Sequence, residues 1–147
     1  MFDSKNLTYI LTMLEAIEKI KLYTKEFNDE ESFYFANKQL NFNAAVNLLI
    51  VCGEENKKID KRLKTSKEIN WQNVSAMRDK ISHDYRGIDE SIVWDIVQNY
   101  LPKLKKALTE MIPKVENYQL YIKEALKSNY YQEIEYLKAI FKTGKVK

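Results

Sequence analysis

The sequence has 147 residues, 45% of them hydrophobic and 31% charged, and this balance is typical of one globular domain that folds without disulfides or metal. Three glycines and two prolines are too few turn signals for a many-stranded sheet, and the net charge of +3 is too small to indicate nucleic acid by itself. The single Cys52 excludes an internal disulfide, and no apolar run approaches the ~18–20 residues of a membrane span, so we expect a cytoplasmic protein that does not associate with membranes.

The first predicted helix is capped by Asp3 or Ser4 and runs to about Phe27. Its apolar residues recur at the three-and-four spacing of one buried face: Leu7, Ile10, Leu11, Leu14, Ile17 and Ile20. Asp29 supplies the cap of the next segment. The N-terminal part of the chain is therefore predicted to be helical.

The most apolar stretch of the chain predicts a central buried helix that contains Ala45, Leu49 and Cys52. Cys52 is expected to be inert core. Gly53 lies inside the same pattern, where glycine costs about 1 kcal/mol relative to alanine. A close contact with another helix would explain a glycine there.

A polar stretch follows, and its lysine run over residues 57–67 is either a solvated helix end or a track for an RNA backbone. Asn70 can cap a short helix from Trp71. Gly87 is the expected chain reversal, and Asp89 caps a further helix that Pro102 should kink or split. The helices so far alternate with short connections, as in an up-and-down bundle.

The C-terminal part is predicted to add two helices, one opened by Pro113 and one capped by Asn129. Residues 102–147 carry 10 basic and 5 acidic side chains, a balance that permits a polyanionic partner. Tyrosines in this part are expected to be half-buried between helices, with base stacking as the alternative. We expect an all-α bundle over residues 1–112 and a helical extension over residues 113–147 that packs on the same domain.

Residues 77–87 concentrate the groups that can do chemistry, and they include the only histidine, His83. Histidine takes and gives protons near neutral pH, since its unperturbed pKa is about 6.5. Arg78 offers a permanently charged fork for a phosphate or carboxylate. Asp79, Ser82 and Asp84 are candidates for supporting roles, and no metal site is predicted. On a continuous helix His83 would be turned about 140° from Arg78, so either the helix unwinds near Ser82 or His83 meets a second chain.

The segment Met77-Arg78-Asp79-Lys80-Ile81-Ser82-His83-Asp84-Tyr85 resembles the motif of the HepT-like toxins of the HEPN superfamily, an arginine, four residues, a histidine, one residue and a tyrosine. The flanks resemble that family too, with residues 14–20 like its first helix and residues 50–54 like its Gly-Glu segment. The similarity covers roughly residues 5–112. Two departures are Asn47, where a basic residue is often found, and the chain after Pro113, which runs past the usual core.

The resemblance implies a bundle of HEPN type and a metal-independent endoribonuclease toxin without cofactor, with Arg78 and His83 as catalytic residues. Cleavage needs a base for the ribose 2′-hydroxyl, an acid for the leaving 5′-oxygen and a cation for the phosphorane charge. One histidine cannot easily be both base and acid, and the resemblance implies a homodimer that shares one cleft. It also implies a minimal nucleotidyltransferase antitoxin as partner, which silences the toxin by adenylylation (AMPylation) of Tyr85.

Other interpretations stay open at this point. The chain could be a non-catalytic HEPN module that binds nucleotide or substrate for a partner nucleotidyltransferase, or an assembly bundle whose polar cluster closes a dimer. His83 could merely cap a helix end, and Arg78 could form a salt bridge. Tyr85 could pack at a dimer seam, and Asp79 is expected to be a structural partner rather than a catalyst.

Overall fold

The computed structural model of the chain describes residues 1–84 and 87–142, with the backbone alone for His83 and Asp84. In chain order the elements are α1 (Lys5–Thr24), α2 (Glu30–Phe35), η1 (Ala36–Gln39), α3 (Leu40–Asn56), η2 (Lys61–Leu63), α4 (Trp71–Ser75), α5 (Met77–Ile81), β1 (Ser82–Asp84), β2 (Gly87–Ile88), α6 (Glu90–Asp95), η3 (Ile96–Tyr100), α7 (Leu101–Met111), η4 (Ile112–Lys114), α8 (Tyr118–Ala125) and α9 (Leu137–Phe141). Among these elements no helix is long and apolar enough to span a membrane.

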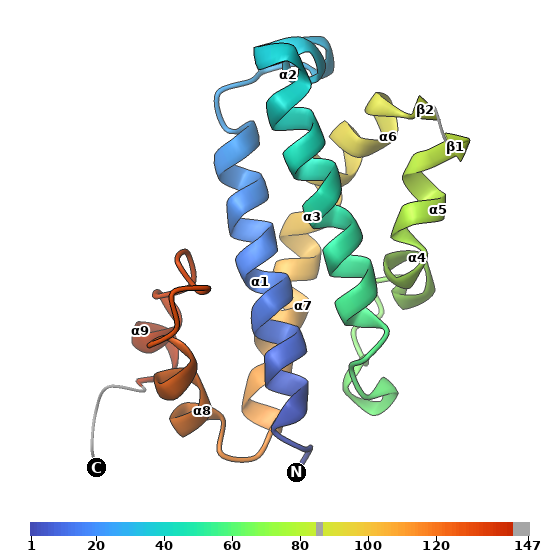
Figure 1. Cartoon of the computed structure of the whole chain (residues 1–147). Coiled ribbons are helices and arrows are strands. Elements are labelled where there is room, and N and C mark those ends of the chain that lie inside the picture. The colour runs from blue at the N-terminus through green and yellow to red at the C-terminus, as the bar shows by residue number, and fades with distance from the viewer. Residues whose placement is uncertain (85–86, 143–147) are drawn as a thin grey trace.

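The bundle is built on the pair α1 and α3, which lie side by side (Figure 1). The α7 helix packs on α1, and α4 and α5 pack on α3. Successive long segments run in alternating directions, α1 up, α3 down, α4–α5 up and α6–α7 down in the view of Figure 1. The predicted all-α up-and-down bundle is confirmed.

The core lies where the apolar faces of these helices meet. The α1 face predicted from the sequence is buried, with Leu7, Ile10, Leu14 and Ile17 at most 1% exposed. Each such side chain contributes about 1.5–3 kcal/mol by leaving water. Cys52 is also buried in this core, which confirms its predicted place.

Side-chain caps begin three of the helices as predicted. The Asp29 carboxylate accepts a hydrogen bond from the Ser32 amide at α2, and Asn70 accepts one from the Asn73 amide at α4. Asp89 accepts from two amides at the start of α6. These local bonds satisfy amides that have no partner within the helix, which is why the sequence alone located them.

The contact expected at Gly53 is also present. A Cβ added to Gly53 would lie 2.8 Å from the carbonyl oxygen of Val74 and 3.0 Å from Cβ of Met77. The α3 helix therefore approaches α4 and α5 at a distance that only glycine allows without a shift.

The turn between α2 and α3 was not predicted. Asn37, Lys38 and Gln39 all have left-handed backbones, with φ of 52°, 56° and 70°. Phe35 and Leu40 on either side are exposed at 65% and 66%. The helix pair α2 and α3 thus turns through a strained segment rather than a glycine loop.

Two predicted helix starts in the C-terminal part are wrong. Pro113 lies in the short 3₁₀ turn η4, and α8 starts only after Asn117, which has a left-handed backbone. The intervening Val115 pairs with Phe2 of the N-terminus instead of continuing a helix. Asn129 caps no helix, since α9 starts at Leu137.

The predicted break at Pro102 is confirmed. Proline has no backbone N–H, so it cannot close the helical hydrogen bond expected at its position. One turn of π-helix, η3, separates α6 from α7 just before this proline. Pro102 then stands in the first turn of α7, where its missing N–H costs nothing.

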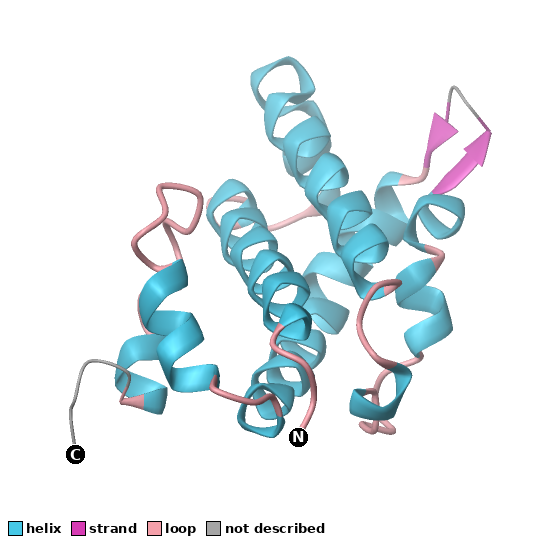
Figure 2. Ribbon diagram, turned by 60° about the horizontal axis from the view of Figure 1, so that its bottom comes forward, coloured by secondary structure: helices cyan, strands magenta, loops and turns pink. Residues whose placement is uncertain are grey.

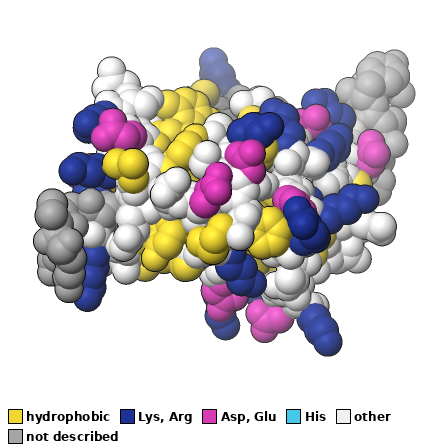
Figure 3. Space-filling view, turned by 90° about the horizontal axis from the view of Figure 1, so that it is seen from below, with side chains coloured by type: hydrophobic (Ala, Val, Ile, Leu, Met, Phe, Trp, Pro, Cys, Tyr) yellow, Lys and Arg dark blue, Asp and Glu magenta, His cyan; other side chains and the backbone are white. Residues whose placement is uncertain are grey.

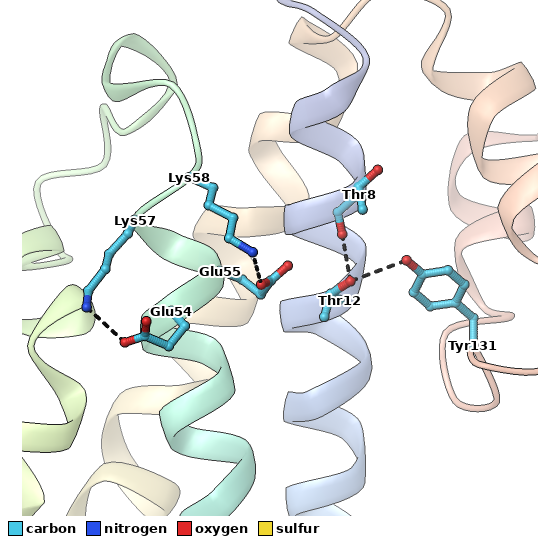
Figure 4. A network of polar contacts seen from close by, with 7 residues as sticks. All are labelled: Thr8, Thr12, Glu54, Glu55, Lys57, Lys58 and Tyr131. Carbon is cyan, nitrogen blue, oxygen red and sulfur yellow. Dashed lines mark hydrogen bonds and ion pairs between the residues drawn. The ribbon is translucent and has the colours of Figure 1, made fainter.

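The described residues after 113, up to residue 142, pack against the outer face of α1, opposite α4 and α5 (Figure 2). Tyr121 is hydrogen-bonded to Thr8, and Tyr131 to Thr12 at 3.3 Å (Figure 4). The buried Glu15 carboxylate accepts the Glu133 amide at 2.9 Å. Tyrosine hydroxyls thus fasten this segment to polar positions of α1.

Candidate functional site

Arg78 is presented by the short helix α5. The predicted helix from Trp71 is divided by Ala76, whose backbone is not helical, into α4 and α5. Met77 and Ile81 bury the inner side of α5. Arg78 and Asp79 lie on its exposed side.

The helix ends inside the motif, at Ile81. Ser82 has an extended backbone, with φ −116° and ψ 122°, and begins the strand β1. β1 pairs with β2 in an antiparallel hairpin, and the Asp89 amide donates to the Ile81 carbonyl at 2.8 Å. Of the two arrangements allowed by the sequence, the structure has the unwound helix.

The structure thus brings Arg78 and the backbone of His83 into one helix–strand unit at the edge of the bundle (Figure 2). The side chains of His83 and Asp84 lie outside what the structure describes. Tyr85 lies outside the described residues altogether. The hairpin itself was not predicted, since three-residue strands leave no periodic signal.

Glu54 of α3 is an acid whose charge interacts with that of Arg78. The hydrogen bond and charge of Lys57 lower the pKa of Glu54, and the charge of Arg78 lowers it further. The Lys57 ammonium lies 2.8 Å from the Glu54 carboxylate on the surface (Figure 4). Glu54 was not among the predicted site residues, although it belongs to the segment 50–54 that resembles the Gly-Glu segment of the family.

A depression of about 670 Å³ lies beside α4 and the start of α5, the helix that carries Arg78. Six of its eight lining residues are of polar type, and three of these are lysines: Lys57, Lys61, Lys64, Trp71, Gln72, Ser75, Ala76 and Asp79. Figure 3 shows the molecule from below. Lys and Arg side chains gather in the right half of this view, which is the side of α4 and α5 in Figure 1, and a few acidic side chains lie among them. Part of the lysine run noted in the sequence therefore lies beside the motif helix.

Lys64 is the most enclosed of these lysines. Its ammonium donates to the carbonyl oxygen of Asn56 at 2.6 Å. Burial lowers the pKa of Lys64, and the charge of Lys61 lowers it further. Cations held this close together favour an anion between them.

Of the predicted supporting residues, Asp79 lines this depression and Ser82 follows the last residue of α5. Within the part of the chain that the structure describes, no three His, Cys, Asp or Glu side chains cluster as a metal site would require. The described residues bring together a guanidinium, several ammonium groups and the carboxylates of Glu54 and Asp79.

Comparison with known proteins gives a consistent result. The sequence model of the family described as "Ribonuclease HepT-like" matches residues 13–111. A protein of Thermococcus cleftensis named as a ribonuclease HepT is 35% identical over 98 residues, which are 66% of this chain and 86% of that protein. Two Methanocaldococcus jannaschii proteins named as RNases are 32% and 30% identical over 109 residues, 74% of this chain and 88% and 91% of theirs. No solved structure matches the chain.

Proposed function

The chain belongs to the Ribonuclease HepT-like family, and on that premise we propose that it is a cytoplasmic, metal-independent endoribonuclease toxin that uses Arg78 and His83. The observation that carries the assignment of residues is the end of α5 at Ile81. A chain that leaves the helix at Ser82 no longer has to turn His83 about 140° away from Arg78. Both residues can then serve one phosphate.

The proposed reaction is an attack of the ribose 2′-oxygen on the adjacent phosphorus. A base takes the 2′-hydroxyl proton, the bond from phosphorus to the 5′-oxygen breaks, and an acid gives the leaving oxygen a proton. The products are a 2′,3′-cyclic phosphate and a 5′-hydroxyl. His83 acts as base or acid, worth typically 10²–10⁴-fold in rate, and Arg78 stabilises the negative charge on the phosphorane oxygens.

A homodimer would complete this site. Each chain carries one histidine, whereas the reaction needs a base and an acid in the same turnover. The motif lies at the edge of the bundle, where a second copy can approach (Figure 1). A dimer-breaking variant that still cleaved RNA at full rate as a verified monomer would exclude the shared site.

Tyr85 is proposed as the regulatory position. A minimal nucleotidyltransferase antitoxin would transfer adenylate from ATP to its hydroxyl and release pyrophosphate. The added phosphate, two residues from His83, would compete for Arg78 and block the cleft. Incubation with a minimal nucleotidyltransferase of this kind and ATP should add mass to the Tyr85 peptide, and Tyr85→Phe should prevent it. An unmodified Tyr85 would count against this regulation.

We also propose that residues 1–112 are the catalytic bundle and residues 113–147 an added extension. The family match stops at residue 111, and α8 and α9 lie beyond it. Ile122, Ile134 and Leu137 of the extension are buried. A chain shortened after Ile112 should therefore lose stability yet keep a measurable rate of RNA cleavage.

The test of the function is cleavage of single-stranded RNA in the presence of EDTA. Wild-type protein should cut the RNA, whereas His83→Ala and Arg78→Ala should lose at least 100-fold in rate while keeping the helical circular dichroism of the fold. Lys80→Ala is the matched control, because Lys80 is an exposed cation of the same helix. Equal rates for His83→Ala and wild type would favour the non-catalytic module instead.

A further inference from the structure

We infer that the depression between the end of α3 and the helices α4 and α5 is the groove that holds the RNA backbone next to the scissile phosphate. The groove is defined by the eight lining residues given above, from Lys57 to Asp79. This inference rests on the proposed function, since it assigns the path of the substrate to that site. The ligand class is a single RNA strand, bound through its phosphates.

The charge of the groove favours a polyanion. Lys57, Lys61 and Lys64 line it, and the mutual repulsion of the latter two is relieved when a phosphate lies between them. Asp79 lines the groove, Glu54 pairs with Lys57, and Asp60, which is paired with Arg62, acts by its charge on Lys64. The pair between Lys57 and Glu54 is exposed on both sides and hence weakly held, so a phosphate can displace the carboxylate.

Two walls of the groove are joined by hydrogen bonds to a buried side chain. Asn56, which is fully buried, donates from its amide nitrogen to the Trp71 carbonyl at 3.1 Å and to the Ser75 hydroxyl at 2.8 Å. Its own backbone carbonyl receives the Lys64 ammonium. One buried residue thus ties the lysine wall at the end of α3 to the polar wall on α4.

Besides cations, the groove contains an aromatic ring and neutral hydrogen-bonding groups that can contact RNA bases. Trp71 is half-buried in its lining, with its indole nitrogen donating to the Ser66 carbonyl at 3.2 Å, so its ring is held in position. An indole beside a line of cations is the arrangement that proteins use to stack the bases of single-stranded nucleic acids. Gln72 and Ser75 add neutral hydrogen-bonding groups on the same wall.

The groove reaches α5, the helix that carries Arg78. Asp79 lines it and is adjacent in sequence to Arg78. Glu54 of α3 lies between the groove and Arg78, because its carboxylate pairs with Lys57 and its pKa is lowered by the charge of Arg78. A strand that follows the lysines from η2 toward α5 therefore reaches Arg78.

The test measures RNA affinity in a His83→Ala background, which prevents cleavage. A fluorescein-labelled single-stranded RNA is titrated with protein, and anisotropy is recorded between about 50 and 200 mM KCl. The double variant Lys57→Gln/Lys61→Gln removes two exposed groove lysines. It should raise Kd by about tenfold or more, and it should reduce the slope of log K against log salt by about 1.4, since each phosphate contact on a single strand contributes about 0.7.

The matched control is Lys123→Gln/Lys127→Gln on α8 and the residues after it, on the opposite side of the bundle (Figure 1). It removes the same charge, and Lys127 is paired with Glu124 at i,i+3 as Lys57 is with Glu54. Its Kd should stay within about twofold of the background, since these lysines lie far from the groove. Equal affinities for the two double variants would overturn the groove, as would an acidic protein partner that uses these lysines while RNA affinity is unchanged.

The two hypotheses fail in different ways. If wild-type protein cleaves RNA but the groove lysines do not affect its binding, the groove inference is wrong and the ribonuclease function stands. If the chain neither binds nor cleaves RNA, both are wrong.

Discussion

Replacing Gly53 with alanine should have two opposite effects on the stability of the protein, a gain in helix propensity and a loss from overpacking. In an unconstrained helix interior the change stabilises by about 1 kcal/mol. Here the new Cβ would lie 2.8 Å from the Val74 carbonyl oxygen, which is backbone and cannot rotate away. It would also lie 3.0 Å from Cβ of Met77. Overpacking of this kind costs about 1–3 kcal/mol, so the net result should be a loss of stability.

The expected magnitude is a net destabilisation of about 1 kcal/mol, the overpacking cost less the propensity gain. Urea unfolding followed by circular dichroism measures the free energy of unfolding. Asn47→Ala is the control, since Asn47 is an exposed residue of the same helix and should change stability by only a few tenths of a kcal/mol. An increase of about 1 kcal/mol for Gly53→Ala would refute the close contact between α3 and α4–α5.

The same substitution should also lower catalysis. The contact at Gly53 is with α4 and the first residue of α5, and Arg78 is the next residue along the chain. A shift of that helix by a few tenths of an ångström moves the guanidinium relative to the phosphate. Small misplacements are costly in rate, so we expect RNA cleavage to fall by about tenfold or more at a temperature where the variant is folded.

Three further predictions concern the supporting structure. Asn70→Ala removes the cap of α4 and should cost about 1 kcal/mol in urea unfolding, whereas Asn70→Asp should retain most of it. Burial alone would raise the pKa of Glu18, but the hydrogen bond and charge of Lys105 outweigh it and hold that pKa below its ordinary 4.5. The stabilisation is therefore complete above that value and lost as pH falls through the lowered pKa, so Glu18→Gln should flatten the melting temperature against pH in acid. Burial raises the pKa of Cys52 to about 12, so its thiol should react with a disulfide reagent only after unfolding; rapid reaction of folded protein would contradict its burial.

Local chemistry accounts for the features that were predicted correctly from the sequence. Asp29, Asn70 and Asp89 each cap a helix through bonds to amides two or three residues away. The apolar face of α1 follows from its spacing alone. Gly53 was informative because glycine weakens a helix, so its presence within α3, in the last turn, indicated that another chain segment approaches closely there.

Long-range contacts account for the features that the sequence did not predict. Pro113 would suit a helix start, but the N-terminal Phe2 pairs with Val115 and holds the chain extended there. Residues 129–136 are positioned by tyrosine hydroxyls bound to Thr12 and Glu18 of α1. Partners more than 100 residues away leave no local signal.

The candidate site likewise combines features that local sequence predicts with features that depend on long-range contacts. The motif spacing made Arg78 and His83 the candidate catalytic residues and raised the problem of their relative orientation. The end of α5 at Ile81 depends on the pairing of β1 with β2, and no periodicity indicates so short a hairpin. The charge interaction of Glu54 and the polar wall of α4 depend on packing across helices.

The most direct test of the proposed mechanism is the chemistry of the RNA ends after digestion in EDTA. The mechanism predicts fragments that carry a 2′,3′-cyclic phosphate and a 5′-hydroxyl from wild-type protein, and intact RNA from both Arg78→Ala and His83→Ala. Fragments with 5′-phosphate ends, or the same fragments from either variant at the wild-type rate, would contradict it.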